Sequence, residues 1–317
     1  MLKSADRARY TALPGFVYTR QAGFRQLQCS QGTSGSSSDH STSVTFMLLA
    51  VNVGNSHTVT GVFYDQALIH QWQLKSDHGK TADELAIRYY SLFQIDNLQK
   101  EDITAFIVSS VVPTLENSWL QFASKYLANC PTSPIAVSHR TDTGLTLLTT
   151  NPAELGADRI VNAAAAWESF GTAAIVVDVG TAITFDCVSK RGEHLGGTIH
   201  PGIGISLDAL AERTAKLPRI ELNEKPLAVI GANTVDAICS GTLHGFGGLI
   251  DRMIELLGKE MRERGAVAAD GKINVIATGG MAEIIAPHSS AVEFVDPTLT
   301  LTGLRLIYER NRRQEDC

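Results

Sequence analysis

The stretch Ile175-Val-Val-Asp-Val-Gly-Thr-Ala-Ile-Thr-Phe-Asp186 decides the fold. Its apolar residues, interrupted by Asp178 and Gly180, predict a buried strand, a tight turn and a returning strand. Gly180 has no Cβ, so a phosphate group can approach the backbone N–H groups of the turn. Thr181 and Thr184 offer hydroxyls beside it, and Asp178, at a strand end, can hold a cation. The chemistry suggested is the binding of nucleotide phosphates.

The same pattern occurs earlier in the chain. Val51-Asn-Val-Gly-Asn-Ser-His-Thr58 aligns without gaps on Val177-Asp-Val-Gly-Thr-Ala-Ile-Thr184, and Asn52 stands where the second copy has Asp178. Either copy alone is also compatible with an ordinary β-turn, because short motifs often match by chance. The pair predicts a chain built from two similar halves.

The composition is that of an ordinary globular protein that is long enough for two domains. The 317 residues are 44% hydrophobic and 19% charged, with a formal net charge of −6,. Nucleic acid is not an expected partner, because binding a phosphate backbone normally needs a basic face. No apolar run reaches the roughly 18–20 residues that span a bilayer, so no membrane association is expected. Five separated cysteines without a Cys-x-x-Cys pair favour a reducing, cytoplasmic location,.

Residues 1–46 differ from the rest of the chain. Residues 1–30 have no sustained periodicity, and residues 31–43 are rich in Gly, Ser and Thr, which is typical of a flexible linker,. Met47 directly precedes the first predicted strand. We therefore expect either a disordered extension or a translation start placed too far upstream.

The pattern of strands and helices predicts an α/β fold with a duplicated βββαβα arrangement. In the first half, strands are predicted over residues 47–53, 58–64, 67–74 and 105–110, with helices over 81–94 and 113–127. Short strands follow at 135–137 and 145–148. In the second half, we predict a strand pair around Gly180, a strand at 193–199 and a helix that ends near 214. One or two helices over 234–257, a strand at 272–277 and a helix at 281–286 follow. We place one domain at 47–155, a second at 156–310 and a tail at 311–317.

Gly156-Ala-Asp-Arg159 leads straight into an Ala-rich helix predicted over residues 160–168. Gly156 allows close approach of a ligand, and Asp158 and Arg159 lie near a helix N-terminus, where anions bind favourably. An Asp before such a helix is also compatible with a simple N-cap. Gly279-Gly280, between a predicted strand and helix, suits an adenine lying against the backbone.

Two βββαβα halves with a glycine turn in each first hairpin resemble the ribonuclease H-like superfamily of actin, hsp70 and sugar kinases. Four motifs narrow the resemblance: Asn52–Ser56, Gly156–Arg159, Asp178–Ala182 and Gly196–Gly202. Together they resemble the type III pantothenate kinases, the bacterial family that opens coenzyme A synthesis, over about residues 47–310. The resemblance implies a homodimeric kinase that uses ATP, Mg²⁺ and a potassium or ammonium ion to convert pantothenate to 4′-phosphopantothenate.

The resemblance also implies roles for individual residues. Asp158 would accept the proton of the pantothenate hydroxyl, and Asp178 would bind the monovalent cation. The implied ATP-binding residues are Asn52, Val53, Gly54, Asn55, Ser56, His57, Thr58, Val59 and Thr181. The implied pantothenate-binding residues are Thr149, Gly156, Ala157, Asp158, Arg159 and Thr234.

Two residues depart from the family pattern. Asn52 stands where the family has Asp, which lowers the negative charge available to Mg²⁺. Thr149 stands where the family usually has Tyr, which removes an aromatic wall from the implied pantothenate pocket. Two alternatives to an active pantothenate kinase therefore remain: a catalytically impaired binding or regulatory homologue, and a kinase for another small hydroxyl compound.

Overall fold

The computed structural model describes residues 46–127, 129–130, 133–222 and 228–315. The expectations for residues 1–45 lie outside this range. Among the described helices, none combines the length and apolar character needed to cross a membrane.

The first half forms a five-stranded sheet in the order β3-β2-β1-β4-β5. Its strands are β1 (Met47–Val53), β2 (His57–Tyr64), β3 (Ala67–Lys75), β4 (Ala105–Ser110) and β5 (Ile135–Ala136). β1, β2 and β3 pair antiparallel, and β4 and β5 add parallel strands. α1 (Ala82–Ile95) begins at the predicted capping box of Thr81 and Glu84, and it packs with α2 (Pro113–Tyr126) on one face. The predicted βββαβα order of the first half is confirmed.

The second half forms a six-stranded sheet in the order β11-β10-β7-β8-β9-β6. Its strands are β6 (Thr146–Leu147), β7 (Ala174–Val179), β8 (Ala182–Val188), β9 (Glu193–Pro201), β10 (Asn274–Thr278) and β11 (Phe294–Val295). Between β9 and β11 lie α4 (Ile203–Arg213), α5 (Thr234–Glu263) and α6 (Ala282–Ile285). Read from β9, the strand order of the second sheet is β9-β8-β7-β10-β11, which repeats the order β3-β2-β1-β4-β5 of the first sheet. The predicted duplication is therefore confirmed.

Short 3₁₀ turns complete the elements at Lys100–Asp102, Pro152–Glu154 and Ala286–His288. α5 is a single helix of 30 residues and continues past the predicted end at 257. Its apolar side packs on the β7–β8 face that carries Val177 and Phe185.

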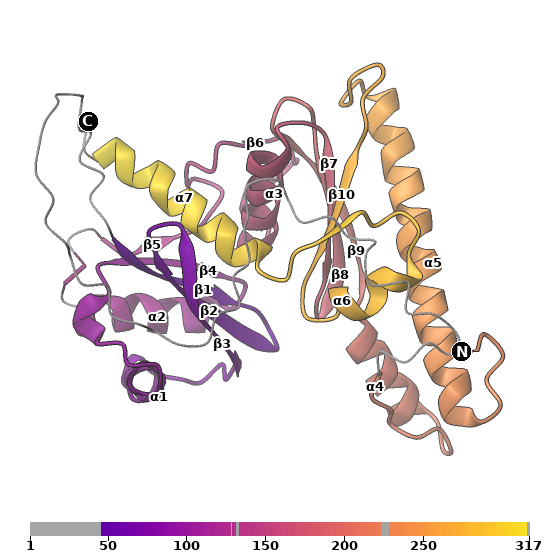
Figure 1. The fold of residues 1–317 in the computed structure, drawn as a ribbon, viewed down its shortest axis with the longest axis horizontal. Helices are drawn as coiled ribbons and strands as arrows, with labels where there is room; N and C mark the ends of the chain where they lie inside the picture. Colours follow the sequence, from indigo (N-terminus) through magenta and orange to yellow (C-terminus); the bar gives the residue numbers. More distant parts are fainter. Residues whose placement is uncertain (1–45, 128, 131–132, 223–227, 316–317) are drawn as a thin grey trace, which may run out of the picture.

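Two helices lie between the sheets (Figure 1): α3 (Ala157–Phe170) and α7 (Leu299–Glu315). They pack against each other, α7 also contacts β1 and β4, and α3 also contacts β7 and β8. The C-terminal helix thus returns to the first sheet and remains helical through residue 315, while β6 joins the second sheet. The chain therefore crosses between the sheets on both sides of residue 155, where we placed the domain boundary, and that boundary stays a prediction.

Candidate active site

The two glycine turns meet between the two halves of the molecule. In the first turn the Gly54 N–H donates to the carbonyl of His57 at 3.0 Å, and in the second the Gly180 N–H donates to the carbonyl of Ala182 at 3.0 Å. The hydroxyls of Ser56 and Thr181 lie 2.8 Å apart and share a hydrogen bond. Two motifs that are far apart in the sequence therefore lie side by side in the structure.

The segment after β3 braces the first turn. Ser76 donates its hydroxyl to the Gly54 carbonyl at 2.6 Å and its N–H to the Ser56 carbonyl at 2.9 Å. His78 Nε2 lies 3.1 Å from the carbonyl oxygen of Asn55. Sequence reasoning missed Ser76 and His78, because only the pairing of β2 with β3 brings them to the turn.

Asn52 lies near the end of β1, where its side chain has a fixed partner. The register of β1 and β4 places it beside Ser109, whose hydroxyl donates to Asn52 Oδ1 at 2.8 Å. An Asp at this position would accept the same hydrogen bond and add a negative charge. Asn52 therefore keeps the local geometry that a carboxylate would have and lacks its charge.

Asp158 lies in the first turn of α3, and its carboxylate is partly buried. Gly156 is the N-cap, so the alternative that Asp158 is the N-cap is wrong, and the helix begins three residues before the predicted start. Asp158 Oδ1 accepts a hydrogen bond from the Arg159 N–H at 2.8 Å. A Cβ at position 156 would lie 2.7 Å from that oxygen, so a side chain there would displace the Asp158 carboxylate. Burial raises the pKa of Asp158,.

The two carboxylate oxygens of Asp178, at the end of β7, face different surroundings. Oδ2 accepts a hydrogen bond from Asn162 Nδ2 at 3.0 Å. Oδ1 faces the glycine turns, because a Cβ on Gly180 would lie 3.4 Å from it and a Cβ on Gly279 would overlap it. Burial and, next, the charge of Asp158 raise the pKa of Asp178 to about 7, although the Asn162 hydrogen bond opposes the shift,.

The Gly279-Gly280 turn lies against the second glycine turn. Gly279 has a φ of +93°, which favours glycine, and a Cβ there would lie 2.8 Å from the backbone of Val179,. The Met281 N–H donates to the Val179 carbonyl at 3.1 Å. The turn that we predicted for adenine therefore adjoins the end of β7 and Asp178.

Arg159 forms an ion pair with a buried carboxylate that sequence reasoning did not predict. Its Nε and Nη2 lie 3.0 and 2.8 Å from Asp186 Oδ1. His194 Nε2 lies 2.8 Å from the same oxygen, and Asp186 and His194 have almost no exposed surface. The pairing of β8 with β9 brings His194 to Asp186, and together they hold one edge of the guanidinium in place.

A pocket of about 560 Å³ lies beside Arg159 at the edge of the second sheet. Its walls come from residues 148–155, from β8 and β9, and from the last turns of α5. Thr149 and Thr198 line it, and their buried hydroxyls have no hydrogen-bond partner among the described residues. Because buried polar groups are nearly always hydrogen-bonded, the pocket suits a polar ligand that reaches these hydroxyls and Arg159.

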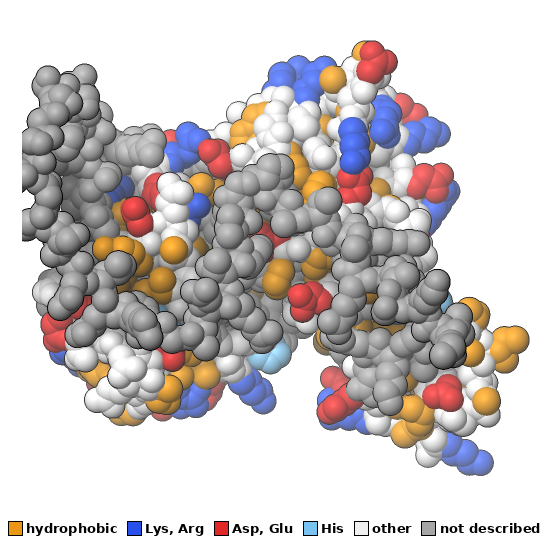
Figure 2. Space-filling view, viewed as in Figure 1, with side chains coloured by type: hydrophobic (Ala, Val, Ile, Leu, Met, Phe, Trp, Pro, Cys, Tyr) orange, Lys and Arg blue, Asp and Glu red, His pale blue; other side chains and the backbone are white. Residues whose placement is uncertain are grey.

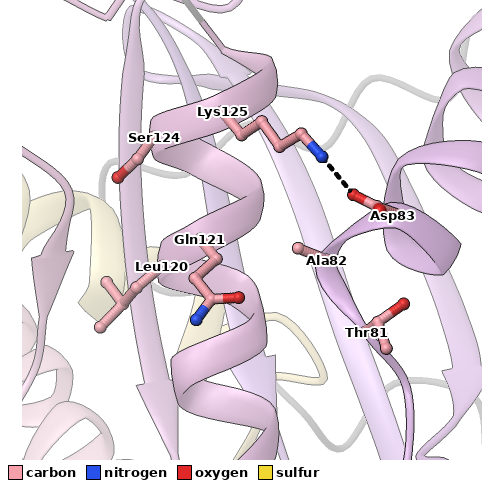
Figure 3. Close-up of a pocket in the computed structure, with 7 residues that line it drawn as sticks. All are labelled: Thr81, Ala82, Asp83, Leu120, Gln121, Ser124 and Lys125. Atoms are coloured by element: carbon pink, nitrogen blue, oxygen red, sulfur yellow. Dashed lines mark hydrogen bonds and ion pairs between the residues drawn. The ribbon is translucent and has the colours of Figure 1, made fainter.

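A larger pocket, of about 650 Å³, lies between α1 and α2 (Figure 3). Asp83 and Lys125 form an ion pair at its rim, with Lys125 Nζ 2.8 Å from Asp83 Oδ1. None of the predicted ATP- or pantothenate-binding residues lines it. Volume alone therefore does not locate the candidate active site.

Thr234 is exposed in the first turn of α5. Leu257, which lines the pocket beside Arg159, lies about 23 residues further along the same helix, or about 35 Å at the helical rise,. Within one chain, the structure therefore does not bring Thr234 together with Thr149 and Arg159.

Comparison with known proteins identifies the family. The model of the type III pantothenate kinase family matches residues 48–256. The type III pantothenate kinase of Desulfotalea psychrophila is 43% identical over 85% of this chain and 100% of its own, and that of Desulfatibacillum aliphaticivorans is 45% identical over 83% and 98%. Among solved structures, a polyphosphate/ATP-glucomannokinase from an Arthrobacter species has a TM-score of 0.42 and 13% identity over 85% of this chain and 99% of its own. The sequence matches decide the assignment: the chain belongs to the type III pantothenate kinase family.

Proposed function

We propose that this chain transfers the γ-phosphoryl group of ATP to the hydroxyl of pantothenate and forms 4′-phosphopantothenate, the first step of coenzyme A biosynthesis. The observation that carries this proposal is the meeting of the two glycine turns at Ser56 and Thr181, 2.8 Å apart, beside the end of β7. Phosphoryl transfer depends mainly on alignment and charge balance. Two backbone turns that face each other suit the alignment of a phosphate chain.

Asp158 is proposed to orient the pantothenate hydroxyl and accept its proton. Its carboxylate is tied to the start of α3 through the Arg159 N–H, at 2.8 Å, so its position is set by the backbone. Burial raises the pKa of Asp158, which increases its affinity for a proton relative to a free Asp side chain,. The group is therefore suited to take the proton as the bond from oxygen to phosphorus forms.

The ATP phosphates are proposed to lie against residues 52–59 and Thr181, with Mg²⁺ and a potassium or ammonium ion balancing their charge. One carboxylate oxygen that faces the turns is a suitable ligand for a cation,. Asp178 Oδ1 faces the turns, and the negative charge of Asp158 contributes to the raised pKa of Asp178. Arg159, the guanidinium nearby, is already paired with Asp186. We assign Asp178 Oδ1 as a ligand of the monovalent cation.

Pantothenate is proposed to occupy the pocket beside Arg159. It carries a carboxylate, an amide and hydroxyls, and the pocket offers a guanidinium and the unpaired hydroxyls of Thr149 and Thr198,. Thr149 supplies a hydroxyl at the position where the family usually has Tyr. A small hydroxyl side chain leaves more space than a ring, so this residue bears directly on substrate choice.

A homodimer is part of the proposal, and the surface around the start of α5 supports it. Hydrophobic side chains gather there, at the lower right of Figure 2. The exposed apolar residues on β9, on α4 and near the start of α5 are Ile199, Ile205, Leu210, Val229, Ile230 and Val235. Exposed apolar patches of this kind mark interaction sites. Thr234 lies among them, so contact between two copies is the arrangement in which it could approach bound pantothenate.

The test is ADP release by the purified protein with ATP, Mg²⁺, K⁺ and pantothenate, measured beside Asn52→Asp and Asp158→Asn. Wild-type turnover that Asp158→Asn abolishes is the expected result. The second candidate is a catalytically impaired homologue, which the neutral Asn52 side chain favours. An inactive wild type beside an active Asn52→Asp variant would support it. If all three proteins are folded and inactive with pantothenate but turn over another small alcohol, the chain is a kinase with a different substrate.

A further inference from the structure

We propose that Asn162 is a positioning residue for Asp178, and that Thr300 of the C-terminal helix holds the Asn162 amide in place. The inference rests on the proposed role of Asp178 as a ligand of the monovalent cation. It concerns two side chains that have no role in the proposed phosphoryl transfer. Both are joined to the site by hydrogen bonds.

Asn162 is buried, with 1% of its surface exposed, and it lies one helical turn after Asp158 on α3. Its Nδ2 donates to Asp178 Oδ2 at 3.0 Å, and its Oδ1 accepts a hydrogen bond from Thr300 Oγ1 at 2.7 Å. An amide oxygen only accepts and an amide nitrogen only donates. Because the ionised Asp178 carboxylate also only accepts, the nitrogen must face Asp178, and the Thr300 hydroxyl holds the amide in that orientation by donating to Oδ1,.

The hydrogen bond from Asn162 to Asp178 gives the two carboxylate oxygens of Asp178 different roles. Oδ2 is held toward α3 by Asn162, so the carboxylate plane is restricted, and Oδ1 faces the turns at Gly180 and Gly279. Partners of this kind, which orient a ligand without touching the ion, commonly govern metal affinity. Asn162 is therefore placed to keep Oδ1 in the direction from which a cation would bind.

The chemical type of the partner matters as much as its position. A Lys or Arg at residue 162 would neutralise Asp178 and weaken its attraction for a cation. A neutral amide donates a hydrogen bond and leaves the negative charge available. The pairing thus suits a carboxylate that must stay ordered and still bind a weakly held monovalent ion.

Thr300 links this arrangement to the first half of the molecule. It lies in the first turn of α7, which packs on β1 and β4. The orientation of Asp178, on the second sheet, consequently depends on a helix that is seated on the first sheet.

The experiment compares wild type with Thr300→Val, Thr300→Ser and Asn162→Leu. The first readout is the K⁺ concentration that gives half-maximal ADP release at saturating ATP, Mg²⁺ and pantothenate. The second is the thermal midpoint without substrates in KCl and in tetramethylammonium chloride of equal ionic strength. We expect Thr300→Val and Asn162→Leu to raise the half-maximal K⁺ concentration about tenfold, with the rate at saturating K⁺ largely retained. Thr300→Ser keeps the hydroxyl and should match the wild type.

Three outcomes would overturn the inference. One is a folded Thr300→Val protein with an unchanged K⁺ response, which decides the matter even if Asn162→Leu fails to fold. Another is an equal loss of rate at every K⁺ concentration in Thr300→Val and Thr300→Ser, which would indicate a packing effect. The third is a wild type that turns over without any response to K⁺ or NH₄⁺, in which case the kinase proposal stands and the cation role of Asp178 falls. A separate case is that neither the wild type nor any variant turns over. If KCl then raises the thermal midpoint of the wild type and Thr300→Val removes that rise, the inference stands and the kinase proposal fails.

Discussion

The Ser56 hydroxyl lies 2.8 Å from the Thr181 hydroxyl, across the boundary between the two halves. The hydrogen bond is exposed, and a typical hydrogen bond contributes only about 0.5–1.5 kcal/mol to stability,. Its main consequence is therefore geometric. It aligns two turns whose backbone N–H groups and hydroxyls would face the same phosphate chain.

Replacing Thr181 by Val should weaken ATP binding with little effect on folding. Val keeps the branched shape of the side chain and removes the hydroxyl that meets Ser56 and is proposed to meet ATP. We expect the KM for ATP to rise about tenfold, which corresponds to about 1.4 kcal/mol. Thr181→Ser, which keeps the hydroxyl, is the matched control in the same steady-state assay. An unchanged KM in Thr181→Val, or an equal rise in both variants, would contradict the proposed contact.

Asp158→Asn should slow turnover strongly and stabilise the protein at neutral pH. Burial raises the pKa of Asp158 in the folded state, so the unfolded chain loses this proton at a lower pH. The free energy of unfolding therefore falls as the pH rises from the ordinary pKa of Asp through the raised pKa of the folded state. An Asn side chain does not ionise, so the variant does not lose this stability. The rate should fall by about 10²–10⁴. In thermal unfolding from pH 4 to 8, with chelator and without nucleotide, the midpoint of the variant should rise relative to that of the wild type as pH increases.

The exposed Asp270→Asn substitution provides the control for this pH series. Its thermal midpoint should follow that of the wild type at every pH. If Asp158→Asn also followed the wild type, burial would not be acting on the charge of Asp158 in the absence of ligands.

The hairpin turns could be predicted from the sequence because their signal is local. Gly54 and Gly180 each follow a buried apolar strand, and the register across each turn is fixed within a few residues. The start of α3 was harder to predict, since its N-cap, Gly156, makes no side-chain hydrogen bond. In such a helix the favourable capping residue type, Asp158, misleads a reading based on preferences alone.

The contacts that orient the site could not be predicted, because they depend on packing between distant segments. His194 reaches Asp186 through the pairing of β9 with β8, and an irregularity in that pairing shifts the register at Cys187/Val188. Thr300 reaches Asn162 only because α7 returns to pack on α3. No short motif encodes either relationship.

Thr149→Val should stabilise the ligand-free protein and weaken pantothenate binding. The Thr149 hydroxyl is buried without a partner in the described structure, so its desolvation is uncompensated there. Removing it should raise the free energy of unfolding by about 1 kcal/mol, the lower end of the cost of a buried unsatisfied group. If pantothenate satisfies that hydroxyl, its KM should rise several-fold while the KM for ATP stays constant. Urea unfolding and steady-state kinetics measure the two effects separately. A variant that is stabilised with an unchanged pantothenate KM would place the substrate elsewhere.

Adjacent glycines on α5 should respond in opposite directions to the same substitution. A Cβ on Gly247 would overlap the carbonyl oxygen of His288, whereas a Cβ on Gly248 would meet no atom within 4 Å. Gly247→Ala should therefore lower the free energy of unfolding by about 1–3 kcal/mol, the usual cost of overpacking. Gly248→Ala should raise it by about 0.5–1 kcal/mol, because Ala restricts the unfolded chain and favours the helix. Urea denaturation of both variants beside wild type measures the difference. Equal shifts would mean that α5 does not pack closely on the 3₁₀ turn Ala286–His288 in solution.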